Sequence, residues 1–172
     1  MEAGYQLAPL LYLYNGGPLL VYNGQEVGAS GAGVEGFSGD DGRTSIFDYW
    51  RIPELSAWVN NGAFDGGGLT QAQRDLRAYY GAILSLAQHP IVRSNRYWNL
   101  EYLNTAEPDL YSFARFITGD GRVMVVVANF RPGAATSGSI RIPAEFALPA
   151  NVGLAGNNLR VRRILTRTGS DA

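Results

Sequence analysis

The 172-residue chain contains no cysteine, no lysine and a single histidine, His89. Without cysteine it can form no disulfide, no thiolate nucleophile and no cysteine-ligated metal site. No apolar run approaches the roughly 18 residues of a membrane span, so no membrane segment is expected. Fourteen arginines stand against 15 acidic residues, and this net charge of −1 gives no reason to expect nucleic acid or an acidic membrane as a partner.

The residues that are abundant place the chain among globular proteins. Hydrophobic residues make up 46% of it and charged residues only 17%, whereas a disordered chain has less of the first and more of the second. The chain also has 22 glycines and 12% aromatic residues. Aromatic rings beside amides and carboxylates are the materials of sugar-binding sites, but the same composition also describes any loop-rich domain.

The stretch from Pro18 to Gly28, PLLVYNGQEVG, has the pattern of a buried β-strand followed by a polar loop. Its apolar run, residues 19–22, is flanked on both sides by Asn-Gly turn signals, which is typical of a strand covered on both faces of a parallel sheet. Such strands present the residues that follow them at the carboxyl edge of the sheet, where α/β proteins usually build their sites.

Apolar spacing predicts three helices in the first half of the chain. Residues 3–14 are apolar on nearly all sides, with Pro9 indicating a late start or a bend. A small helix is expected from Pro53 through residue 58. The clearest helix runs from Thr70 to Gln88, because Thr70 and Gln73 have the spacing of a capping box and an apolar stripe follows.

Near residue 90 the hydrophobic period changes from 3.6 to 2, which makes this point the predicted domain boundary, between residues 1–90 and 91–172. Residues 110–117 and 122–129 read as two strands joined by the hairpin loop Thr118-Gly-Asp-Gly121. Residues 139–142 and 159–165 read as further strands of an antiparallel sheet or sandwich.

Four segments, in this order, resemble glycoside hydrolase family 13, the α-amylase family. GGPLLVYNGQEVG resembles that family's eighth barrel strand, and LRAYYGAILSLAQHP its eighth barrel helix. YSFARF and RVMVVVANF resemble the opening of domain C. The resemblance implies an α/β plus all-β fold: the C-terminal end of a (β/α)8 barrel, followed by an antiparallel β-sandwich that is truncated. It also implies a parent enzyme that is a retaining glycosidase acting on α-glucans such as starch and maltooligosaccharides.

The same resemblance implies that this chain carries no catalytic residue. The family uses a carboxylate nucleophile after strand four, a Glu acid after strand five and an Asp with a neighbouring His after strand seven, all of which would precede this chain. His89 is instead expected at a helix terminus. We therefore expect the chain to be inactive by itself, with neither a cofactor nor a metal.

The candidate substrate-binding residues are Gln25, Glu26, Asp48, Tyr49 and Trp50. Each has a structural alternative. Gln25 can bond a backbone group instead of a sugar hydroxyl, and Glu26 matches a position that is not catalytic in the family. Trp50 can pack the preceding glycine-rich loop onto the barrel.

Two other functions remain open at this point, together with one interaction. The second half could be a non-catalytic carbohydrate-binding or interaction module with stacking platforms at Tyr97, Trp98, Tyr102 and Tyr111. The chain could also be an active hydrolase using Glu26 with Asp48 or Glu54, although only the presence of acids supports this. An incomplete barrel would expose apolar surface, so self-association is expected.

Overall fold

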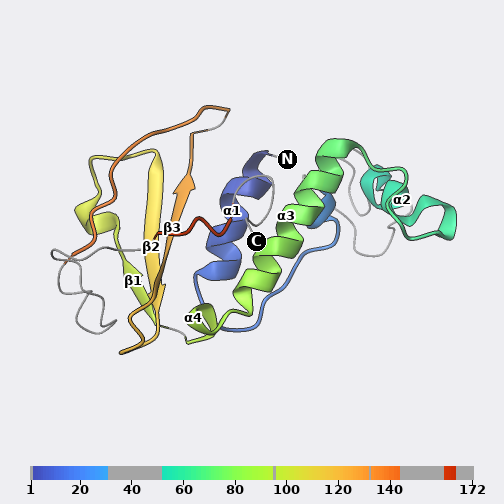
Figure 1. The fold of residues 1–172 in the computed structure, drawn as a ribbon. Helices are drawn as coiled ribbons and strands as arrows, with labels where there is room; N and C mark the ends of the chain where they lie inside the picture. Colours follow the sequence, from blue (N-terminus) through green and yellow to red (C-terminus); the bar gives the residue numbers. More distant parts are fainter. Residues whose placement is uncertain (1, 31–51, 95, 132, 144–160, 166–172) are drawn as a thin grey trace, which may run out of the picture.

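The chain folds into helices packed against a small antiparallel sheet (Figure 1). This computed structural model describes residues 2–30, 52–94, 96–131, 133–143 and 161–165. The α-helices are α1 (Glu2–Leu13), α2 (Pro53–Val59), α3 (Gln71–Ala87) and α4 (Pro90–Arg93). The 3-10 helices are η1 (Gln25–Val27), η3 (Asn60–Gly62) and η4 (Glu101–Leu103). No helix among the described residues is long and apolar enough to cross a membrane.

Helix α1 contains Pro9, which has no amide hydrogen for the carbonyl of Tyr5 four residues earlier. That carbonyl is not left without a donor, because the hydroxyl of Tyr79 on α3 donates to it at 3.0 Å. The rings of Tyr5 and Tyr79 also pack with their centroids 4.9 Å apart. The helix predicted for residues 3–14 is therefore confirmed, and a contact from α3 compensates for its proline.

Helix α3 begins at the predicted capping box. The Thr70 hydroxyl accepts from the amide of Gln73, and the Gln73 side chain accepts from the amide of Thr70 at 2.8 Å. These two bonds satisfy amides that have no partner within the helix. The buried residues of α3 all lie on the predicted apolar stripe: Leu76, Tyr79, Tyr80, Ile83 and Ala87.

The sheet has the order β1-β2-β3, with both pairs antiparallel. Its strands are β1 (Tyr97–Asn99), β2 (Leu110–Phe116) and β3 (Val123–Asn129). Strands β2 and β3 form the predicted hairpin, in which Phe113 lies opposite Val126. The described chain is thus a mixed helix and sheet structure, with an antiparallel sheet in its second half as expected.

One hydrophobic core joins the helices to the sheet. It contains Tyr12 of α1, Tyr80 and Ile83 of α3, and Phe113 and Val126 of the sheet. Figure 1 shows α1 between the sheet and α3, with α2 beyond the far side of α3. Residues from both sides of the predicted boundary near residue 90 therefore contribute to the same core.

The other face of the sheet is covered in part by a second cluster, whose buried members are Leu100, Ala114 and Phe116. Ile140 and Ile142 pack against this cluster from the segment that follows the hairpin. On the same side, β3 leaves Val125 and Val127 39% and 46% exposed. Strand β2 is thus buried on both faces, while β3 is apolar on a face that is partly open.

The predicted strand at residues 19–22 is wrong for the described structure, in which this segment is extended but forms no strand. A strand needs a neighbouring backbone to complete its hydrogen bonds, and no described segment pairs with this one. Leu19 and Val21 pack on the main core, whereas Leu20 is 81% exposed.

The predicted strand at residues 139–142 is likewise not formed. Ile140 and Ile142 pack through their side chains without joining the sheet ladder. Of the strand predicted at residues 159–165, only residues 161–165 are described, and they form no strand. Apolar alternation was present in these segments, but it does not by itself supply a pairing partner.

Candidate functional site

The structure describes two of the five predicted substrate-binding residues, Gln25 and Glu26. Both lie in η1, between Gly24 and Gly28, which have φ values of 81° and 69°. Positive φ favours glycine, and a Cβ on Gly24 would lie 2.6 Å from the side chain of Ala29. The two glycines therefore fix the tight turn that positions Gln25 and Glu26. The other three predicted residues, Asp48, Tyr49 and Trp50, lie outside the described residues.

Gln25 links the extended segment to both long helices. Its Oε1 accepts from the Tyr22 amide at 3.1 Å and from the Tyr12 hydroxyl of α1 at 3.3 Å. Its Nε2 donates to the Tyr80 hydroxyl of α3 at 3.0 Å. These bonds use the amide of Gln25 within the protein, so the alternative to sugar binding, a bond to the backbone, is observed together with two side-chain bonds.

The two tyrosines that bond Gln25 are held in their neutral form. Burial raises the pKa of Tyr12 and of Tyr80, and the negative charge of Glu26 acts in the same direction. Their hydrogen bonds to Gln25 oppose these effects. The rings meet edge to face with centroids 5.9 Å apart. The arrangement is a hydrogen-bonded support under η1 and provides no charged nucleophile.

Glu26 is half-buried and forms no hydrogen bond or ion pair with another residue that the structure describes. Glu54, in the first turn of α2, has a buried Oε2 atom without a hydrogen-bond partner. Next to these acids, Val27 and Leu55 belong to one small cluster that packs η1 against α2. Within the described residues no group of three or more His, Cys, Asp or Glu could hold a metal ion.

The aromatic residues proposed as stacking platforms are mostly occupied by packing. Tyr97 and Tyr111 pack against the main core, and Trp98 packs against the second cluster. Burial, as the main cause, raises the pKa of Tyr97, and its ring lies 4.5 Å from that of Tyr14. Of the four, Tyr102 is the most exposed, with 57% of its surface accessible.

Sequence analysis missed Arg115, which is fully buried near the C-terminal end of β2. Its guanidinium donates to the carbonyl of Tyr14 at 2.6 Å and to the carbonyl of Val92. These carbonyls lie at the C-terminal ends of α1 and α4, where the helix dipoles are negative. Burial lowers the pKa of Arg115, and its Nε has no partner. The only sequence signal was a charged residue inside the apolar run LYSFARF.

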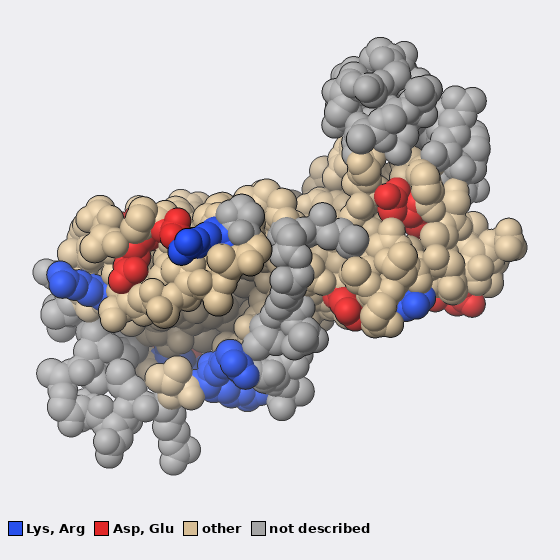
Figure 2. All heavy atoms as spheres, turned by 90° about the horizontal axis from the view of Figure 1, so that it is seen from above, with Lys and Arg blue, Asp and Glu red and all other residues tan. Residues whose placement is uncertain are grey.

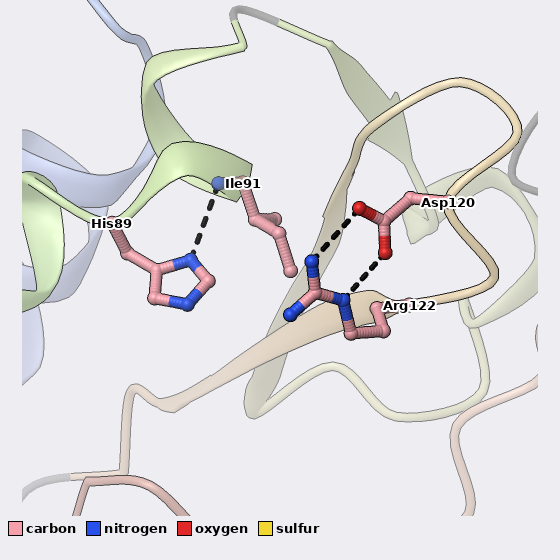
Figure 3. A network of polar contacts seen from close by, with 4 residues as sticks. All are labelled: His89, Ile91, Asp120 and Arg122. Atoms are coloured by element: carbon pink, nitrogen blue, oxygen red, sulfur yellow. Dashed lines mark hydrogen bonds and ion pairs between the residues drawn. The ribbon is translucent and has the colours of Figure 1, made fainter.

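His89 lies at a helix terminus as predicted (Figure 3). Its Nδ1 accepts from the amide of Ile91 at 3.2 Å and thereby caps α4. Nearby, Arg122 forms a two-point ion pair with Asp120, at 2.5 and 2.8 Å, in the hairpin loop. The bond to Arg122 lowers the pKa of Asp120, and the proximity of His89 adds to this effect. His89 therefore caps a helix, and it forms no hydrogen bond or ion pair with an acidic residue in the part of the chain that the structure describes.

The described residues form no large patch of one sign of charge on the face that Figure 2 draws. On the face in Figure 2, acidic and basic side chains occur in small separate groups among uncharged residues. One hollow of about 480 Å³ lies along α3 beside Ile164 and Leu165. Another, of about 560 Å³, lies between residues 15–19 and the end of α3. Neither is lined by Gln25 or Glu26.

Comparisons of the chain with protein-family models, with curated proteins and with solved structures find no match. No relative therefore bears on the substrate or on the site.

Proposed function

We propose that the chain is the C-terminal part of an α-amylase-like glycoside hydrolase of family 13 that acts on α-glucans. In this proposal residues 1–90 are the end of a (β/α)8 barrel, and residues 91–172 are part of a domain C-like β-sandwich. The chain is inactive by itself because the catalytic carboxylates belong to the missing part of the barrel.

The observation that carries the proposal is an apolar surface on α1 and on the extended segment after it. Leu7 and Leu11, one helical turn apart, are 44% and 54% exposed, and Leu20 and Tyr22 are 81% and 46% exposed. Exposed apolar residues in this number usually mark a surface that another element covers. Neighbouring barrel strands would cover them and would form with residues 19–22 the sheet ladder that no described segment forms with them.

The partly open face of the sheet supports the second half of the proposal. Val125 and Val127 point away from α1 and α3, on the side where Ile140 and Ile142 cover only part of the sheet. A second sheet packed on this side would complete a sandwich.

Within this proposal, Gln25 is a positioning residue that holds the strand end against α1 and α3 through Tyr12 and Tyr80. Glu26, whose carboxylate is not used by any described residue, remains a candidate to contact substrate. Asp48, Tyr49 and Trp50 remain candidates for the rim of the cleft.

An immunoblot of the native source with an antibody against this chain tests the proposal. The antibody should detect a protein much larger than 18.6 kDa, and the reading frame upstream of Met1 should encode the missing barrel strands with their catalytic carboxylates. A native band at 18.6 kDa, together with a promoter directly before Met1, would contradict the proposal.

The purified chain should release no reducing sugar from maltooligosaccharides. If it does release sugar, and Glu26→Gln abolishes the release, the chain is itself a hydrolase and the proposal of an inactive part fails. Arg122→Gln, a change in the exposed hairpin loop, is the control and should leave any release of sugar unchanged. Phe116→Ala cannot serve as the control, because it disrupts the second cluster and so would disturb folding.

A further inference from the structure

We propose that Phe64 is an α-glucan contact residue, whose ring stacks on the apolar face of a sugar. This inference rests on the proposed function for the class of ligand. It assigns a binding role to a residue that sequence analysis did not select, in the loop between α2 and α3.

Phe64 has a backbone conformation that aromatic residues rarely adopt. Its φ is +54°, in the left-handed region that favours glycine. Asn60 and Asn61, earlier in the same loop, also have positive φ values, of 46° and 55°. Asparagine tolerates this region, but phenylalanine does so only at a conformational cost. Residues held in such conformations are concentrated at functional sites.

The ring of Phe64 makes few buried contacts that could offset this conformational cost. Its surface is 62% exposed, and Phe64 belongs to none of the hydrophobic clusters of the described residues. Glycine or asparagine would fit the backbone better and would lose only the contacts of the smaller, covered part of the ring. The chain thus presents an aromatic ring to the outside at a position where the fold itself does not need one.

The loop around Phe64 is tied down by its own hydrogen bonds. The Phe64 amide donates to the Val59 carbonyl at 3.0 Å, and the Gly66 amide donates to the Trp58 carbonyl at 3.1 Å. Asp65 Oδ1 accepts from the side chain of Asn60 and from the Gly67 amide, both at 2.8 Å. The hydrogen bond from Asn60 is the main cause that lowers the pKa of Asp65. The carboxylate of Asp65 therefore stays charged and keeps its bonds to Asn60 and Gly67.

Packing from α3 holds the same loop. The Arg77 guanidinium lies 3.8 Å from the centre of the Trp58 ring. Gly66 lies against that ring so closely that a Cβ on it would be 2.8 Å from a ring carbon. An aromatic ring presented on a support of this kind loses little conformational freedom when it binds a ligand.

Two observations favour a sugar as the ligand. Asn61 is exposed, and its amide has no hydrogen-bond partner among the described residues, so an apolar ring and a free polar group occur three residues apart. Pyranose rings present the same combination, an apolar face with hydroxyls around it. In the proposed barrel, this loop follows the last strand, on the side where barrel enzymes bind substrate.

Affinity electrophoresis tests the inference. The mobility of the chain in a native gel that contains soluble starch is divided by its mobility in a gel without starch. Because self-association lowers both mobilities, their ratio reports the binding of starch. We expect starch to retard the wild-type chain, and Phe64→Asn to raise the apparent dissociation constant about tenfold, a typical effect of losing one aromatic contact. Val161→Asn, a change of an apolar residue that is 92% exposed and lies far from this loop in the sequence, should leave the retardation unchanged.

Thermal unfolding of the same variants separates binding from folding. Because asparagine tolerates left-handed backbone, Phe64→Asn should unfold at the same or a higher temperature than the wild type. An unretarded wild-type chain would overturn the inference, and so would equal weakening by the two variants. A loss of retardation accompanied by a lower unfolding temperature would also overturn it. None of these results depends on the size of the native protein, so a failure here is distinct from a failure of the proposed function.

Discussion

At the scale of single residues, the most consequential side chain of the described structure is Arg115. A buried cation usually has a carboxylate partner, whereas Arg115 bonds the carbonyls of Tyr14 and Val92 at two helix ends. It ties β2 to α1 and α4 and so joins the two halves of the chain. Its stabilising effect therefore depends on geometry more than on charge.

Arg115→Met should lower the free energy of unfolding by about 3 kcal/mol, because the buried carbonyl of Val92 and the partly buried carbonyl of Tyr14 lose their donor. Urea unfolding followed by circular dichroism measures this change. Arg122→Met is the matched control, since Arg122 is exposed and pairs only with Asp120 in the hairpin loop. An equal loss of stability in the two variants would refute the role given to Arg115.

The raised pKa of Tyr79 predicts how the stability of the chain depends on pH. Burial, with smaller effects from Tyr5 and Tyr80, raises its pKa from 10.0 to about 12. A group whose pKa is raised by folding stabilises the protein fully below its unfolded pKa and loses this effect as the pH rises through the folded value. The free energy of unfolding should therefore fall between about pH 10 and pH 12.

Tyr79→Phe should make that fall less steep, although other buried tyrosines will keep part of it. The variant should also be less stable at pH 7, because the Tyr5 carbonyl then has neither Pro9 nor Tyr79 as a donor. Urea titrations at pH 8, 10 and 11 measure both effects. An unchanged slope in Tyr79→Phe would show that Tyr79 does not contribute to the pH dependence.

At the scale of elements, the start of α3 depends on one threonine. Thr70→Ala removes the acceptor for the Gln73 amide and should cost about 1 kcal/mol of stability. Thr70→Ser keeps the hydroxyl and should retain most of the stability. Denaturant unfolding of both variants checks this, and an equal loss in the two would mean that the hydroxyl does not act as the cap.

At the scale of the whole molecule, the apolar surface of α1 and the extended segment should make the chain self-associate. Sedimentation velocity should show an average mass that rises above 18.6 kDa as the concentration increases. The double variant Leu11→Ser/Leu20→Ser should shift the chain toward the monomer, because both residues are more than half exposed in the single chain.

Val161→Ser is the control for that experiment. Val161 is 92% exposed but belongs to the segment 161–165, away from α1 in the sequence and outside the surface described above. This change should leave the association unchanged. A concentration-independent monomer for the wild-type chain would contradict the expected self-association.

The sequence by itself determined the elements whose signals are local. The capping box and apolar stripe defined α3, and a period of two around a Gly-Asp-Gly turn defined the hairpin β2-β3, because these patterns act between residues close in the chain. Only the tertiary structure decided what depends on distant partners. Residues 19–22 form no strand because no described segment pairs with them, Gln25 is used by Tyr12 and Tyr80, and Arg115 is buried because two helix ends meet it. The physical reason is that hydrogen bonds and burial need both partners in place, and a pattern in one segment specifies only one of them.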